Sequence, residues 1–123
     1  MLHTLIIFKV NNMKKRWFSF VLDSGCLFEE LVSKFSDVFN KHFSIIDDEG
    51  RYIAVADIGI YTVNIIDKID RLSDHLCDDN YVFEVIIEDD ALFNHHFEAT
   101  IKSILSKGNI KWKRFVWSPD RLE

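Results

Sequence analysis

The 123-residue sequence predicts a single α+β domain over residues 1–123, with a mixed or mostly antiparallel sheet and about three helices packed on it. Its hydrophobic fraction of 48%, with eleven Phe, is enough for a packed core without disulfides or a metal. One stretch has a strong helical period, and several short apolar runs separated by polar turns resemble strands. No repeat and no regular βαβ alternation is present, and the expected order is ββαββαβαβ.

The stretch Ser24–His42 carries the helical period and is the expected core helix. Asp23 or Ser24 is placed to cap its first N–H groups, and acidic residues in its first turn suit the positive end of the helix dipole. At about 100° per residue, one arc of this helix is apolar apart from a histidine at its end: Leu27, Phe28, Leu31, Val32, Phe35, Val38, Phe39 and His42.

Two strands are expected before this helix. Leu2–Val10 is an apolar run typical of a strand covered on both faces, and Asn11-Asn12 marks a turn. Arg16–Leu22 is aromatic and β-branched, which predicts a second strand antiparallel to the first.

The helix is followed by a predicted hairpin, which pairs Phe43–Asp47 with Arg51–Ala56 across the turn Asp48-Glu49-Gly50. Gly59 interrupts the pattern. Residues 60–64 fit either the end of a strand or the start of a helix.

Residues Val63–Leu76 favour a second helix, because their large apolar side chains fall on one helical face: Ile65, Ile69, Leu72 and Leu76. The opposite face of that helix would be acidic, with Asp67, Asp70, Asp74 and Asp78.

The rest of the chain predicts a strand, a third helix and a last strand. Tyr81–Glu88 alternates as a half-buried strand, and Asp89 or Asp90 is expected to cap the helix that follows. Gly108 stands where a C-terminal glycine belongs. The buried stripe of this helix is expected to be Phe93, Phe97, Ile101, Ile104 and Leu105. Ile110–Trp117 is expected to be an edge strand protected by its charges Lys111, Lys113 and Arg114.

Charge is distributed unevenly along the chain. The net charge is −5, but residues 63–106 hold ten acidic and three basic side chains, whereas residues 107–123 hold two and five. The acidic middle repels nucleic acid and attracts basic surfaces. The candidate binding residues are two acidic groups: Asp47, Asp48 and Glu49, then Asp67, Asp70, Asp74, Asp78 and Asp79. Like charges at i,i+3 and i,i+4 destabilise a helix, so the second group indicates either a docking surface for a basic partner or an ordinary solvated face. The first group could add to that surface or could be turn chemistry alone.

Other chemistry has weaker support. Cys26 follows a strand and a glycine at a helix start, which is a possible nucleophile position, but no histidine stands where a base is needed. His95 and Glu98 have usable i,i+3 spacing, yet two ligands do not make a zinc site. We therefore expect no catalytic residues, no metal and no cofactor, and Cys26 and Cys77 are interpreted as free thiols.

The N-terminus lacks a basic region, a long apolar run and a small-residue cleavage site, so we expect a cytoplasmic protein with no membrane or nucleic-acid partner. The oligomeric state is not readable from the sequence.

In size, composition and its acidic groups Asp47-Asp48-Glu49 and Asp67, Asp70, Asp74, Asp78 and Asp79, the chain resembles bacterial immunity proteins of contact-dependent growth inhibition and related polymorphic toxin systems. The resemblance implies a non-catalytic inhibitor that binds a cognate toxin domain, often a basic nuclease. Two alternatives stay open: a phage-type inhibitor of host defence that mimics nucleic-acid charge, and a small thiol enzyme using Cys26. A structural subunit of a larger assembly is a further possibility.

Overall fold

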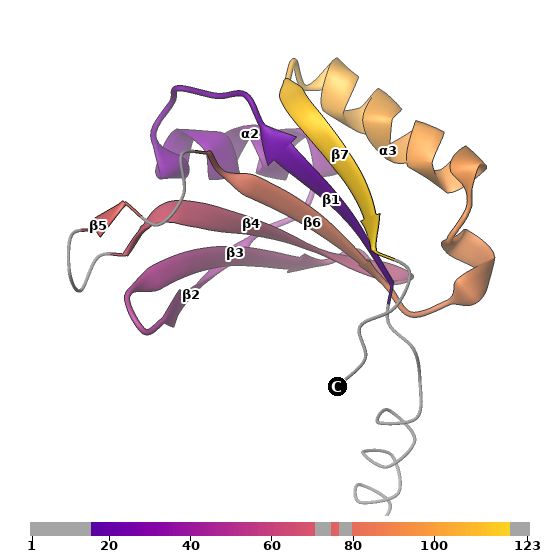
Figure 1. The fold of residues 1–123 in the computed structure, drawn as a ribbon, viewed down its shortest axis with the longest axis horizontal. Helices are drawn as coiled ribbons and strands as arrows, with labels where there is room; N and C mark the ends of the chain where they lie inside the picture. The colour runs from indigo at the N-terminus through magenta and orange to yellow at the C-terminus, as the bar shows by residue number, and fades with distance from the viewer. Residues whose placement is uncertain (1–15, 71–74, 77–79, 119–123) are drawn as a thin grey trace, which may run out of the picture.

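The computed structural model describes residues 16–70, 75–76 and 80–118 of the chain. One sheet and two α-helices account for most of these residues (Figure 1). The elements are β1 (Arg16–Leu22), α2 (Phe28–Phe39), β2 (Ser44–Asp48), β3 (Arg51–Asp57), β4 (Tyr61–Asp70), β5 (His75–Leu76), β6 (Val82–Ile87), the 3-10 turn η1 (Asp90–Leu92), α3 (His95–Lys107) and β7 (Trp112–Ser118).

The sheet is antiparallel at every pairing of the described strands. Its order is β2-β3-β4-β6-β1-β7, and the two-residue β5 pairs with the end of β4. This confirms the α+β class and the mostly antiparallel sheet.

Four strands and the two helices follow the order βαββαβ. In this order, α2 connects β1 to β4, and these two strands have β6 between them in the sheet. Likewise, α3 connects β6 to β7, and these two strands have β1 between them. This is the ferredoxin-like arrangement. The hairpin β2–β3 is inserted after α2 and widens the sheet beyond β4. Since this fold hosts many unrelated functions, it does not by itself indicate one.

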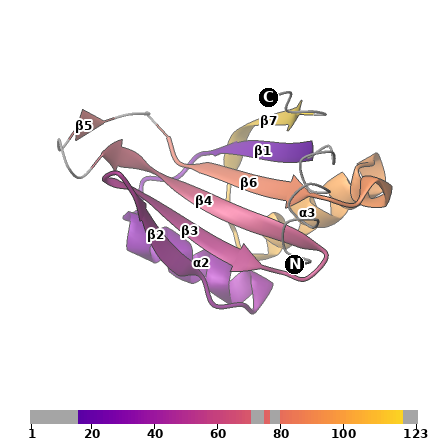
Figure 2. The same cartoon turned by 90° about the horizontal axis from the view of Figure 1, so that it is seen from below.

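The core lies between one face of the sheet and the two helices (Figure 2). Alternate residues of β1 and β6 point toward the helices and are fully buried, among them Phe18, Phe20 and Phe83. The ring of Phe35 in α2 lies 4.6 Å from that of Phe83, and Phe97 in α3 lies 5.7 Å from Phe18. Both helices therefore cover the same face.

The first described strand, β1, lies between two other strands of the sheet. The expected strand Leu2–Val10 lies outside the described residues. β1 pairs with β6 on one side and with β7 on the other, over almost its whole length. The predicted antiparallel orientation of Leu2–Val10 relative to Arg16–Leu22 stays a prediction.

The core helix is confirmed, but it begins later than expected. Leu27 is its N-cap, with extended backbone angles, and Glu30 accepts the Leu27 N–H at 3.0 Å. Neither Asp23 nor Ser24 caps the helix. Because Leu27 and His42 stand outside the helical turns, both are exposed.

The predicted hairpin is confirmed within one residue. Glu49 and Gly50 connect β2 and β3 with φ of 54° and 97°, the left-handed pair that a two-residue hairpin turn requires. Gly59, with φ of 111°, turns the chain between β3 and β4.

The helix predicted over Val63–Leu76 is wrong. Residues 61–70 form β4, a strand paired with β3 on one side and β6 on the other. Val63 and Ile65 are buried on the helix-covered face, while Thr62 and Asn64 alternate with them on the open face. The β-branched residues of this segment therefore follow a period of two, which two neighbouring strands stabilise.

The last strand before the C-terminal helix is confirmed as β6, and the stripe Phe97, Ile101 and Leu105 of α3 is buried as predicted. The caps differ. Asn94 accepts the Phe97 N–H at 2.9 Å and caps α3, whereas Asp89 caps η1.

The end of α3 packs closely against α2. Gly108 is the C-cap, and a Cβ at this position would lie 3.1 Å from the Cβ of Val38. The left-handed residue is the next one, Asn109, with φ of 56°. Gly108 is thus required by close approach to α2 and not by a positive φ.

We predict that Phe35→Ala lowers the free energy of unfolding by about 3–5 kcal/mol, since it removes a fully buried ring from between α2 and β6. Urea denaturation measures this change. The control Ile60→Ala removes a side chain that is 64% exposed and should cost less than about 0.5 kcal/mol. Equal losses from the two substitutions would contradict the described packing.

Candidate protein-binding surface

The acidic hairpin turn is exposed. Asp47 and Asp48 end β2, Glu49 is in the turn, and all three side chains are accessible. Asp47 Oδ1 also accepts the N–H of Gly50 at 2.7 Å, so this carboxylate stabilises the turn as well. The turn leaves its negative charge facing solvent.

The strand register brings a further acidic residue, Asp70, to the same end of the sheet. Asp48 is the cross-strand partner of Arg51, and Arg51 is in turn the partner of Asp70 at the end of β4. We call Asp47, Asp48, Glu49 and Asp70 the acidic end of the sheet. The predicted site residues Asp74, Asp78 and Asp79 lie outside the described residues.

Asp67 is not on the surface. It is 1% exposed on the helix-covered side of β4, and its Oδ1 accepts the N–H of Lys68 at 2.7 Å. Its backbone carbonyl accepts the Nε–H of Arg51 at 2.9 Å. The predicted acidic helix face therefore does not exist, because strand alternation turns Asp67 inward. Asp67 instead helps to hold Arg51 beside the acidic end.

Exposed isoleucines lie next to the carboxylates. All five residues of β2 are exposed, with Ile45 at 48% and Ile46 at 51%. The sequence pattern predicts this strand only as half of a hairpin. The signal that could have identified it is the run Ile45-Ile46-Asp47-Asp48, because a strand with apolar and charged side chains but no buried position belongs at a sheet edge.

The opposite edge of the sheet is basic, and the prediction of an edge strand there is confirmed. Lys111, Lys113 and Arg114 are exposed. A register shift between Val21 and Leu22 interrupts the pairing of β1 with β7 near Lys113. Charges of one sign on an edge strand discourage its pairing with another edge of the same sign.

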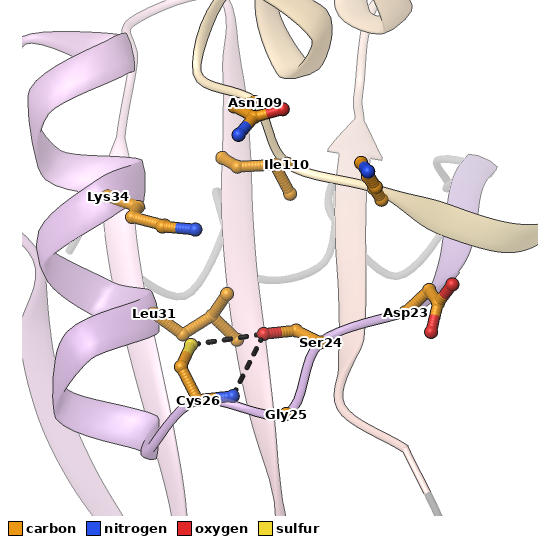
Figure 3. A pocket seen from close by; sticks show the side chains of 9 residues that line it. Asp23, Ser24, Gly25, Cys26, Leu31, Lys34, Asn109 and Ile110 are labelled. Carbon is orange, nitrogen blue, oxygen red and sulfur yellow. Dashed lines mark hydrogen bonds between the residues drawn. The ribbon is translucent and has the colours of Figure 1, made fainter.

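Cys26 is a free, partly buried thiol that lines a pocket of about 310 Å³ between the start of α2 and the segment before β7 (Figure 3). Its Sγ lies 3.0 Å from Ser24 Oγ. Lys34, Asn109 and Lys111 also line the pocket, and no histidine is among its lining residues. The pocket thus offers a thiol and two cations but no imidazole base.

The pair His95 and Glu98 belongs to a hydrogen-bond network at the start of α3. Glu98 lies 3.1 Å from His95 Nδ1 and 2.6 Å from Lys102 Nζ, and it accepts the Nε1–H of Trp117 at 3.0 Å. These contacts join α3 to β7. In the described ranges no three His, Cys, Asp or Glu side chains converge as metal ligands would.

Burial raises the pKa of Glu98, but the hydrogen bonds from Lys102, His95 and Trp117 outweigh it, so the net pKa is below the ordinary value of 4.5. Its side chain is 15% exposed. These interactions favour the charged form in the folded protein, and their role is to hold the helix to the sheet.

Comparison with protein-family models and with curated proteins finds no match for this chain. Across the described ranges, α2 and α3 included, no helix combines the length and apolar character of a bilayer span.

The network at Glu98 predicts a pH dependence of stability. Because the folded pKa is lowered, the contribution of Glu98 is present above pH 4.5 and is lost as the pH falls through its folded pKa. The difference in unfolding free energy between wild type and Glu98→Gln should therefore shrink on acidification. Urea denaturation across a pH series measures it.

The control for this experiment is Glu88→Gln, which alters an exposed carboxylate. Its difference from wild type should stay nearly constant over the same pH series. A Glu98→Gln difference that did not change with pH would show that the network contributes nothing through the charge of Glu98.

Proposed function

We propose that this protein is a non-catalytic immunity protein, which binds and neutralises a cognate toxin domain in the bacterial cytoplasm through the acidic end of its sheet. The observation that carries the proposal is the placement of exposed carboxylates beside exposed isoleucines on one edge strand, β2. The toxin that fits this surface is a basic protein, and a nuclease is the leading candidate.

Composition supports a protein partner for this surface. Protein interfaces combine apolar side chains that become buried with charged residues at the rim. Ile45 and Ile46 can supply the first, and Asp48 and Glu49 the second. Scattered exposed apolar residues need no explanation by themselves. Their proximity to a group of charges that is mostly negative, with Arg51 between Asp48 and Asp70, is what favours binding.

Electrostatics supports a basic partner. A negative group at one end of the molecule accelerates encounter with a positive surface and fixes its orientation, and salt weakens both effects. A nuclease carries cations where it binds phosphates. Carboxylates placed against those cations would exclude nucleic acid, so one contact would give both binding and inhibition.

A thiol enzyme using Cys26 is the second candidate, favoured by the position of this thiol in the pocket of Figure 3. The two proposals separate cleanly. Cys26→Ala should leave binding of the protein partner unchanged, because the pocket lies between α2 and the segment before β7, whereas the acidic end belongs to β2, β3 and β4.

The partner can be identified by co-purification from the source cells at low and at high salt, with mass spectrometry of the bound proteins. A basic protein in stoichiometric amount that is lost at high salt is the expected result. Binding kinetics with that partner then test the site.

We predict that the triple change Asp48→Asn, Glu49→Gln and Asp70→Asn lowers the association rate constant about tenfold at low salt, because it removes the charge that steers encounter. The effect should diminish at high salt. The substitutions are close in size to the wild-type residues, and circular dichroism should show an unchanged fold.

A matched control carries the same charge change elsewhere on exposed residues: Asp37→Asn, Asp57→Asn and Glu88→Gln. It should alter the rate constant by much less than the first triple. If both variants slow association equally, net charge and not the acidic end governs encounter, and the proposed site is wrong.

A further inference from the structure

The two outer strands of the sheet carry opposite charges. β2 and β7 stand at the two ends of the strand order and form opposite edges of the sheet in Figure 1. Asp47 and Asp48 are exposed on β2, with Glu49 next to them, and Lys113 and Arg114 are exposed on β7. One edge of the molecule is thus acidic and the other basic.

Exposed apolar side chains also concentrate on these two strands. Of the five large hydrophobic residues that are well exposed in the described part of the chain, three are Ile45 and Ile46 on β2 and Val116 on β7. Val116 is 43% exposed. Each outer edge therefore has an apolar group and a charge.

Strand direction allows the two edges to meet. Each of the six strands in the path is antiparallel to its neighbour, so β2 and β7 run in opposite directions. A second copy in the same orientation, placed beside β2, would present its β7 antiparallel to that strand. The sheet would continue without a change of pattern.

The lengths of the two edges also agree. β2 pairs with β3 in continuous register over residues 44–48. On β7, the regular part of the pairing with β1 covers residues 114–118, beyond the shift between Val21 and Leu22. Both edges therefore offer five consecutive residues in regular extended structure.

Matched end to end, these two stretches place Asp48 opposite Arg114 of the second copy, and Ile46 opposite its Val116. In each copy these four side chains belong to the sheet face that the helices do not cover, as the strand registers show. The helices of the two copies would thus lie on the same side. Opposite charges and apolar pairs in cross-strand positions stabilise a sheet.

The other possible pairings gain no ion pair. Two copies joined antiparallel through β2 alone, over residues 44–48, would place Asp48 opposite Ser44, and two joined through β7 alone, over residues 114–118, would place Arg114 opposite Ser118. Opposite charges in cross-strand positions stabilise a sheet, and these two pairings have none. Only the unlike pairing of β2 with β7 brings opposite charges together.

We propose that the protein self-associates head to tail, with β2 of one copy adding to β7 of the next to form a continuous antiparallel sheet. Such a contact leaves one free edge at each end, so it builds chains or rings and not closed two-fold dimers. A five-residue contact is small, and the association is therefore weak and reversible. The contact uses β2, which also carries the proposed partner-binding surface, so self-association and partner binding would compete for this strand; measurements on the protein alone test the first without the second.

Sedimentation velocity on the full chain over a range of concentrations tests the proposal. At low salt the average mass should rise with concentration through dimer, trimer and larger species. High salt should shift the distribution toward monomer, because the exposed ion pairs are screened.

Charge reversal identifies the contact. Asp48→Arg and Arg114→Asp should each weaken self-association at least about tenfold, because each variant places like charges opposite each other at positions 48 and 114 of the contact. An equimolar mixture of the two variants should associate again, since every mixed contact then pairs Arg with Asp. Matched reversals at exposed sites off the edges, Asp37→Arg and Lys41→Asp, should leave association unchanged.

Three results would overturn the proposal. Wild-type protein that stays monomeric at every concentration at low salt would exclude the contact. Association that survives both single reversals, or that stops at a dimer, would show that another surface mediates self-association. Failure of the mixture to associate, with both variants folded by circular dichroism, would exclude the pairing of Asp48 with Arg114.

Discussion

The central strand β1 is the constraint on which the rest of the structure depends. It is paired on both sides, and its residues Phe18 and Phe20 are fully buried under the helices. The Phe18 ring contacts Phe97 of α3 and Trp117 of β7, with ring centroids 5.7 and 4.8 Å apart. Aromatic burial of this size stabilises a domain that has no described disulfide. Because β1 and its neighbours form the core, the hairpin at the far edge can expose its whole outer strand.

Charge follows the same division between core and edge. Glu98, the carboxylate with a lowered pKa, is held by Lys102 and Trp117 and stabilises the packing of α3 on β7. The carboxylates Asp48 and Glu49 are exposed on the hairpin, where Asp48 stands opposite Arg51 in the strand register. The first kind of carboxylate holds a helix to the sheet, whereas the second faces solvent at the edge.

Local patterns predicted most of the elements, because burial on one face selects apolar side chains at regular spacing. This explains the agreement for α2, β6 and the α3 stripe. Residues 61–70 were predicted incorrectly, since Ile65 and Ile69 fit both the helical and the strand period, and only the neighbours β3 and β6 decide between them. Asp48 and Asp70 are grouped because each is a cross-strand partner of Arg51. This strand register joins residues that are far apart in the chain. No local pattern contains that information.

The position of β2 also has an evolutionary consequence. None of its five side chains belongs to the core, and the βαββαβ arrangement is complete without it. Substitutions in this strand can therefore accumulate at little cost to folding, while each one alters the charge and shape of the surface that we propose binds a partner. A chain built this way can acquire a new specificity through a few changes in one short segment and retain its scaffold.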